Sequence, residues 1–374
     1  MKRGFSTFCR KEKAWLQPYA IYSSLKDYHH GAPWWNWDSS LRNRKGKTYT
    51  NLVKKLSHQI DTYQFIQYLF HIQWRDLHQY AKKKRVGLIG DLPIFVAHDS
   101  ADVWLNRPFF SLENDGRIKF VAGVPPDYFS QDGQLWGTPV YRWENLNKQG
   151  YKWWINRLQK SLSLFDVVRL DHFIGFERYW AVPGSAPTAQ YGSWKKGPGA
   201  HFFQRVLRKI PNAQIIAEDL GSVTAEVTAL REQFGFPGMR VLQFAFETHP
   251  GAEINRPFNF NPNSVVYTGT HDNDTTVGWF KNLLQNGTRE KELVLHYTKS
   301  SGQHIHWDLI RLAMMTQANT VIVPIQDILG LGSEARMNKP GSTEGNWEWR
   351  LAEKCLTSDI IRILRQLTQT YSRT

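Results

Sequence analysis

Acidic residues follow apolar runs at several places along the chain. They are Asp91, Asp171, Glu218 with Asp219 beside it, Asp272 and Asp327. If the runs are parallel strands of one barrel, their carboxyl ends meet on one face, which is where such barrels carry their active sites. Like charges gathered in one place repel each other and are costly unless they are used. The pattern therefore predicts a functional cluster of carboxylates.

Glycoside cleavage is the chemistry that uses such a cluster without a metal ion. One carboxylate attacks the anomeric carbon, and a second, protonated one donates its proton to the leaving oxygen. The covalent glycosyl-enzyme then breaks down with the second acid acting as the base. Helix capping is the alternative for any single acid after a strand. We expect Asp219 and Asp327 either to cap helices or to have no assigned role.

A metal site is the rival use of clustered acids. His29-His30 and His271-Asp272 lack the spacing of a zinc site. Asp272-Asn273-Asp274 lacks the twelve-residue loop of a calcium site. We therefore expect no metal and no other cofactor.

Aromatic residues are abundant, with 16 Trp in the chain. Several fall in segments that read as loops, namely Trp34-Trp35, Tyr128-Phe129, Trp136 and Trp143. Sugar rings present flat apolar faces that stack on such side chains. The alternative is that most aromatics belong to the core, which we expect for Phe70 and Trp74.

Helical and strand-like segments alternate along the chain. The apolar runs that read as buried strands are 86–89, 167–170, 215–217, 241–246, 265–267 and 320–325, and the expected helices include 63–80, 151–162, 202–209, 223–234 and 308–319. This alternation predicts an α/β fold with a parallel sheet, either a barrel or an open sheet. The usual sequence evidence for a nucleotide-binding open sheet is missing, because neither G-x-G-x-x-G nor G-x-x-x-x-G-K-[ST] is present.

The segment from Ala122 to Trp143 is rich in Gly, Pro and aromatic residues and shows neither helical nor strand periodicity. A long segment of this kind inside an ordered chain is usually functional. We expect it to be a loop that covers the active site.

The chain has 374 residues, of which 41% are hydrophobic, and a net charge of +14. Residues 1–60 hold 12 Lys and Arg against 3 Asp and Glu, and a second basic run occupies 82–85. Nucleic-acid binding through these residues is one interpretation, but solvated helix ends and faces are the expected one.

Cys9 and Cys355 form no disulfide framework, and the basic start is not followed by the apolar segment of a signal peptide. The chain also lacks the roughly 18 consecutive apolar residues that a membrane span requires. We therefore expect a cytoplasmic protein without membrane contact.

Six motifs together resemble the 4-alpha-glucanotransferases, also called amylomaltases or disproportionating enzymes. They are Gly90–Val96, Gly123–Phe129, Arg169–Phe173, Ile216–Gly221, Thr270–Asp274 and Gly330–Asn338. The resemblance runs from about Trp15 onward and implies a (β/α)₈ TIM-type barrel of the α-amylase clan with inserted helical subdomains. It also implies retaining transfer of α-1,4-glucan segments between maltooligosaccharides derived from starch or glycogen.

The resemblance assigns roles to matching positions. It implies Asp171 as the nucleophile, Glu218 as the general acid/base and Asp272 as the acid that stabilises the transition state. The positions expected to contact or support the substrate are Arg169, His271, Asp91, Asp127 and Trp136. A fixed cation such as Arg169 beside the nucleophile favours its ionised form.

The family's first two barrel strands have no counterpart in this chain. We expect a mostly helical segment over residues 1–85 and a catalytic barrel over residues 86–374, which holds strands 3 to 8 and a substrate loop at about 121–143. A barrel that lacks two of eight strands leaves two strand edges open. The alternative function is therefore an inactive, truncated remnant that at most binds glucan.

Overall fold

The computed structural model describes residues 2–126, 130–249, 252–286, 289–342 and 344–373. The chain forms two compact units, and each is described by itself. Unit 1 comprises residues 1–215 and 225–230, and unit 2 comprises residues 216–224 and 231–374.

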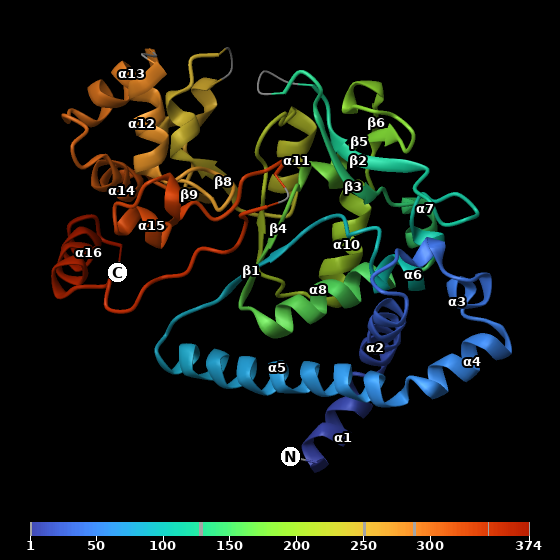
Figure 1. Cartoon of the computed structure of the whole chain (residues 1–374). Helices are drawn as coiled ribbons and strands as arrows, with labels where there is room; N and C mark the ends of the chain where they lie inside the picture. Colours follow the sequence, from blue (N-terminus) through green and yellow to red (C-terminus); the bar gives the residue numbers. More distant parts are fainter. Residues whose placement is uncertain (1, 127–129, 250–251, 287–288, 343, 374) are drawn as a thin grey trace. The chain divides into compact units, whose positions relative to one another are not determined.

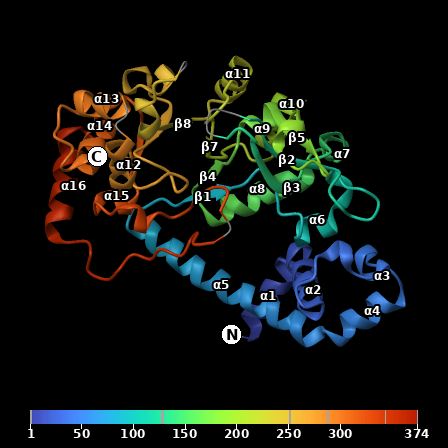
Figure 2. The same ribbon diagram turned by 45° about the horizontal axis from the view of Figure 1, so that its top comes forward.

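Unit 1 begins with five helices. They are α1 (Lys2–Lys11), α2 (Lys13–Tyr28), α3 (Ser39–Asn43), α4 (Gly46–Lys55) and α5 (Ser57–Lys83). The helices α1 and α2 lie against α5, the long light-blue helix of Figure 1, and Figure 2 shows the same arrangement from another direction. Phe8 and Leu16 pack there against Tyr68 of α5. Helix α5 confirms the helix predicted over residues 63–80 and extends it at both ends.

Parallel strands in unit 1 carry several of the residues singled out above. Strand β1 (Ile89–Leu92) pairs with β4 (Val167–Leu170), and Asp91 stands opposite Arg169 in the register. Strand β4 is followed in the sheet by β7 (Ile215–Ala217), since the Val168 amide donates to the carbonyl of Gln214 at 2.9 Å. Helix α8 (Lys152–Leu164) packs on β1 and β4. The remaining helices are α6 (Ala101–Leu105), α7 (Trp143–Lys148), α9 (Ile174–Glu177), α10 (Gly199–Lys209) and α11 (Ala225–Gln233).

A second, antiparallel sheet in unit 1 was not predicted. Its strand order is β3 (Gln134–Pro139), β2 (Phe120–Val124), β5 (Arg178–Pro183) and β6 (Ser193–Lys196). The expectation of a segment without regular structure from 122 to 143 was therefore wrong. The pairing of β2 with β3 shifts between Val121 and Gly123, and a Cβ at Gly123 would lie 2.1 Å from the carbonyl oxygen of Gln134. Such an irregular pairing, which requires glycine, hides the alternation by which strands are recognised.

Unit 2 contains parallel strands in the order β7, β8 (Gly238–Val241), β9 (Ser264–Tyr267) and β10 (Thr320–Ile322). Its helices are α12 (Thr276–Asn286), α13 (Arg289–Thr298), α14 (Ile305–Met315), α15 (Ile325–Ile328) and α16 (Ser358–Thr370). Phe246, Val266, Phe280 and Leu309 belong to its buried core. Helix α14 overlaps the helix predicted at 308–319, but it begins three residues earlier and ends four residues earlier.

Three predicted strands have other bounds in the structure. The run 86–89 gives way to β1 at 89–92, and the run 320–325 ends as a strand at Ile322. The run 241–246 is mostly a 3₁₀ turn, Leu242–Phe246, that follows β8. Leu242, Ala245 and Phe246 are as buried in this turn as strand residues are, so hydrophobicity alone does not distinguish the two. Among the described residues, no helix is long and apolar enough to cross a membrane.

Candidate active site

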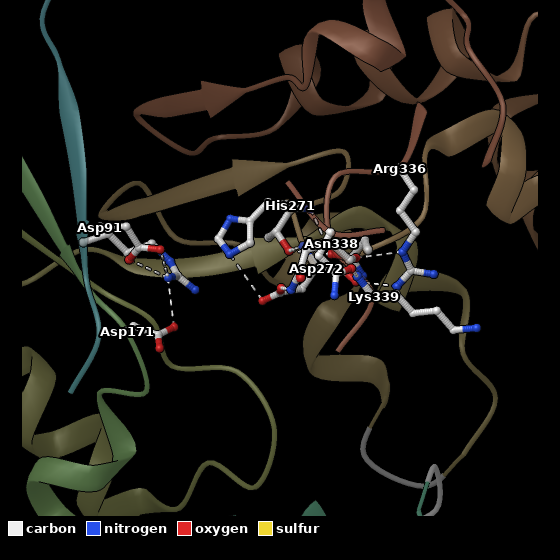
Figure 3. A network of polar contacts seen from close by, with 11 residues as sticks. Asp91, Asp171, His271, Asp272, Arg336, Asn338 and Lys339 are labelled. Atoms are coloured by element: carbon white, nitrogen blue, oxygen red, sulfur yellow. Dashed lines mark hydrogen bonds and ion pairs between the residues drawn. The ribbon is translucent and has the colours of Figure 1, made fainter. Parts of the chain in front are cut away.

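Arg169 joins two acids in unit 1. Its Nη1 donates to both carboxylate oxygens of Asp91, at 2.7 and 2.9 Å, and to Oδ1 of Asp171 at 2.9 Å (Figure 3). The parallel register of β1 and β4 places Asp91 beside Arg169, and Asp171 follows directly at the end of β4. Asp91 lies within β1 rather than after it, which corrects the predicted strand end.

The electrostatics of this trio follow from burial. The Arg169 side chain is only 9% exposed, whereas that of Asp171 is 38% exposed. A planar guanidinium held in place by Asp91 offsets the repulsion between the two carboxylates. The arrangement presents two accessible carboxylates, those of Asp171 and of Asp91 (42% exposed), beside a fixed and nearly buried cation.

Asp272 is held in unit 2 by a segment that precedes α16. The Asn338 Nδ2 donates to Oδ1 of Asp272 at 2.6 Å, and Arg336 Nη2 donates to the Asp272 carbonyl at 2.7 Å. On the other side, His271 Nε2 lies 3.4 Å from Oδ2 of Asp272. Figure 3 shows the Asn338 and His271 side chains at the Asp272 carboxylate and Arg336 beside the same loop.

Trp347 lies next to His271, with the two ring centroids 5.1 Å apart. Its side chain is 60% exposed, and its backbone has a φ of +63°. This left-handed conformation is unusual for a bulky residue, and the Trp347 amide donates to the Met337 carbonyl at 2.7 Å. A large, exposed aromatic ring is thus fixed beside the Asp272 loop.

Sequence reasoning gave no role to Asn338, Arg336 or Trp347. The first two lie within the motif Gly330–Asn338, so their signal was present but not interpreted. Trp347 follows Gly345-Asn346, a pair typical of turns, and its place in a loop is the signal that could have found it.

The neighbouring acids Glu218 and Asp219 have different surroundings in unit 2. Oε1 of Glu218 accepts from the Leu220 amide at 3.1 Å, and the residue is 8% exposed. Asp219 accepts from the Met239 amide at 2.7 Å and lies 3.1 Å from Nε of Arg231. Burial raises the pKa of Asp219, although arginines beside it act in the opposite direction. Asp219 accepts a hydrogen bond from a residue of β8 and does not cap a helix, so the expectation that it is a helix cap was wrong.

Asp327 likewise has a structural role, since it is only 1% exposed. It accepts from Oγ1 of Thr268 at 2.5 Å and from the amide and Oγ1 of Thr276 at 2.7 and 2.8 Å. Thr276 is the first residue of α12, so Asp327 satisfies the N-terminus of a helix that comes before it in the chain. The expected capping role is present, but it serves α12 and not a helix that follows Asp327. Burial raises the pKa of Asp327.

Trp136 lies on β3 in unit 1, edge-on to the ring of His172 at 4.8 Å between centroids. His172 follows Asp171 and has a φ of +49°. Burial lowers the pKa of His172 to about 4, so it is neutral at pH 7. Asp127, the other expected glucan contact of this loop, lies outside the described residues, as do Tyr128 and Phe129.

Several expectations about aromatic residues were wrong. Trp34 and Trp143 were candidates for stacking on sugars, but they are 0% and 8% exposed and belong to the core. Phe70 was expected in the core, but it is 51% exposed on α5. Within the described ranges, no group of three or more His, Cys, Asp or Glu side chains could hold a metal ion.

The sequence matches a known family over most of its length. The family described as 4-alpha-glucanotransferase matches residues 1–357. The 4-alpha-glucanotransferase of Synechocystis sp. is 45% identical over 377 positions, which cover 100% of this chain and 74% of the relative. That of Thermus thermophilus is 44% identical over 381 positions, which cover 100% of this chain and 75% of the relative.

A solved structure agrees with the fold. The amylomaltase from Streptococcus agalactiae in complex with acarbose superposes with a TM-score of 0.94 at 35% identity, over 99% of this chain and 74% of that one. The predicted fold class, a TIM-type α/β fold of the α-amylase clan, is confirmed by this likeness.

Proposed function

Because the chain belongs to the 4-alpha-glucanotransferase family, whose members are glycosyltransferases that act on α-glucans, we propose a mechanism by which it transfers glucan segments. The substrates in this proposal are maltooligosaccharides derived from starch or glycogen, and α-1,4-linked segments move between them with retention of configuration. The observation that carries the mechanism is the Arg169 guanidinium shared by Asp91 and Asp171. It provides a carboxylate that is both accessible and oriented.

In the first step, an Asp171 carboxylate oxygen attacks the anomeric carbon of the donor. The glycosidic bond breaks, and Glu218 gives its proton to the departing oxygen. The products are a shortened glucan and a glycosyl ester of Asp171. Arg169 and Asp91 act through Asp171, because they fix the direction in which its oxygen points.

In the second step, the 4-hydroxyl of an acceptor glucan attacks the same anomeric carbon. Glu218 now takes the proton of that hydroxyl, and the ester bond to Asp171 breaks. Two inversions give net retention. Water competes with the acceptor for the ester, and hydrolysis is the result when water reacts first.

Asp272 is proposed to hold sugar hydroxyls and favour the transition state, with Asn338 keeping its carboxylate in one orientation. His271 would contact the transferred sugar, and the exposed ring of Trp347 beside it would offer a stacking face. Asp127 and Trp136 remain proposed glucan contacts from the loop between β2 and β3.

A cytoplasmic location is part of the proposal. It is supported by the low cysteine content, since Cys9 and Cys355 are both free thiols.

Incubation of the full chain with maltotriose tests the function. We expect a ladder of longer maltooligosaccharides together with released glucose, resolved by anion-exchange chromatography, and no reaction by Asp171→Asn. Glucose and maltose without longer products would mean hydrolysis. An unchanged substrate that still raises the melting temperature of the protein would mean a glucan-binding remnant.

A further inference from the structure

A cavity of about 660 Å³ opens in unit 1, and none of the residues that line it is a proposed catalytic residue. It lies between one side of α5, residues 162–166 and residues 209–212. Residues 162–166 end directly before β4, and residues 209–212 end two residues before β7. The cavity is therefore at the amino ends of these two strands. Asp171 is at the carboxyl end of β4, five residues after Asp166 of the cavity lining, which corresponds to roughly 17 Å along the strand at about 3.3 Å per residue. The mechanism proposed above does not use the cavity.

The charge of the cavity wall is positive. Arg75, Lys82 and Lys209 line it together with one acid, Asp166, so the arginine, lysines and acid of the lining carry a surplus of two positive charges. Asp166 is already engaged, since its Oδ2 accepts from the Leu88 amide at 2.9 Å and lies 3.0 Å from His78 Nε2. Lys82 Nζ lies 3.4 Å from the other Asp166 oxygen. Asp166 therefore has a structural role, and the cations that line the cavity outnumber it.

Lys209 contributes most to this excess. It is exposed in the last turn of α10, and among the ion pairs of the described residues none includes it. Arg75, by comparison, is shared with Asp76, which lies 2.9 Å away and does not line the cavity. An anion in the cavity would find Lys209 available without breaking an existing pair.

The cavity also has flat apolar walls. Trp74 and Phe165 line it and pack edge-to-face at 5.3 Å between centroids. Trp74 is fixed by its indole N–H, which donates to the carbonyl of Leu164 at 2.9 Å. Gln79 and Asn212 add amide groups that can bind hydroxyls. A ligand that fits this lining has an anionic group and a flat, hydroxylated or aromatic body.

We propose that this cavity binds a small phosphate monoester, with its phosphate on Lys209 and Lys82 and its sugar or base against Trp74. A phosphate monoester carries a charge of about −1.5 to −2 at pH 7, which is opposite in sign to the charge of the wall. The volume is within the range of pockets that hold ligands of this size, about 300 to 1,000 Å³. A hexose phosphate and a nucleoside monophosphate share this chemistry. The proposal goes beyond the proposed function and does not depend on it.

Isothermal titration calorimetry with the full chain tests the site. The probes are glucose 1-phosphate, glucose 6-phosphate, AMP and inorganic phosphate, with glucose as the uncharged comparison. We expect the esters to bind, with an affinity that falls as salt is added. Lys209→Gln should weaken ester binding by about tenfold or more, because it removes one charged contact to phosphate. The matched control, Lys148→Gln, removes an exposed lysine at the end of α7 and should bind as the parent chain does.

A second variant addresses the apolar wall. Trp74→Leu should weaken the esters and leave inorganic phosphate unchanged, with a thermal melt confirming that the variant is folded. Tighter binding of AMP identifies a nucleotide site, and tighter binding of the hexose phosphates identifies a sugar-phosphate site. The proposal is overturned if no ester binds at millimolar concentration, if glucose binds as tightly as its phosphates, or if Lys209→Gln binds like Lys148→Gln.

Discussion

His172 makes the stability of the protein depend on pH in a way that can be calculated. Burial lowers its pKa from 6.5 to about 4 in the folded protein. As the pH falls below 6.5, the unfolded chain binds a proton at this histidine first, and the unfolded state is thereby stabilised. The contribution of His172 is thus fully present above pH 6.5 and is lost as the pH falls toward 4.

The magnitude follows from the difference between the two pKa values. One pKa unit corresponds to about 1.4 kcal/mol, so the full loss is about 3 kcal/mol, and about 2 kcal/mol of it falls between pH 7 and pH 5. His172→Asn is the appropriate variant, because asparagine tolerates the left-handed backbone found at this position. Its smaller volume also lowers stability, but by an amount that is the same at both pH values.

Urea unfolding of both proteins at pH 7 and pH 5 isolates this effect. The parent chain should lose about 2 kcal/mol more than the variant between the two pH values, since every other titrating group is common to both. An NMR titration of the histidine ring protons gives an independent reading, in which the His172 signal should move only near pH 4. Equal losses in the two proteins, or a His172 signal that moves near pH 6.5, would refute the reasoning.

Three further substitutions test the surroundings of the proposed site and the core of unit 2. Asn338→Ala removes the donor to Asp272 and should lower kcat for maltotriose by about tenfold to a hundredfold without loss of folding; an unchanged kcat would contradict the positioning role. Trp347→Ala should raise KM by about tenfold with kcat nearly constant, because it removes the stacking face beside His271; the idea fails if KM is unaffected. Asp327→Ala leaves three buried donors without an acceptor and should lower the free energy of unfolding by about 3 kcal/mol; a loss below about 1 kcal/mol in urea titration would speak against it.

The parallel part of the fold was predictable, because its strands are short, continuous apolar runs. The run 167–170 is β4 residue for residue, and Asp171 follows it as predicted. The antiparallel sheet was not predictable from periodicity. Its first pair, β2 and β3, contains Gly123 and an irregular register, and such features remove the alternation on which the prediction depends.

The roles of individual acids could be predicted only in part. Glu218 and Asp219 are adjacent in the sequence, but Asp219 is buried against Arg231 and the Met239 amide. Those partners follow it by 12 and 20 residues, so no local pattern reveals them. The same holds for Asp327, whose partner Thr276 precedes it by 51 residues. Tertiary contacts decide which acids are structural.

The burial of individual aromatic residues could not be predicted from the sequence either. Trp34 lies in a segment that reads as a loop, yet its indole N–H donates to the His98 carbonyl and the ring is fully buried. Phe70 shares its helical spacing with Ile66 and Leu77, yet all three side chains are exposed. Spacing identifies a helix but does not determine which of its faces is covered.

Covalent labelling tests the central claim, that Asp171 is the nucleophile of a retaining transferase, most directly. Glu218→Gln should still be glycosylated by an activated donor such as α-maltotriosyl fluoride, because fluoride leaves without a proton. The ester should then persist, since no base remains to activate an acceptor. Proteolysis and mass spectrometry should locate one maltotriosyl group on Asp171. A label on another residue, or consumption of the fluoride to a β-configured product without any label, would contradict the account.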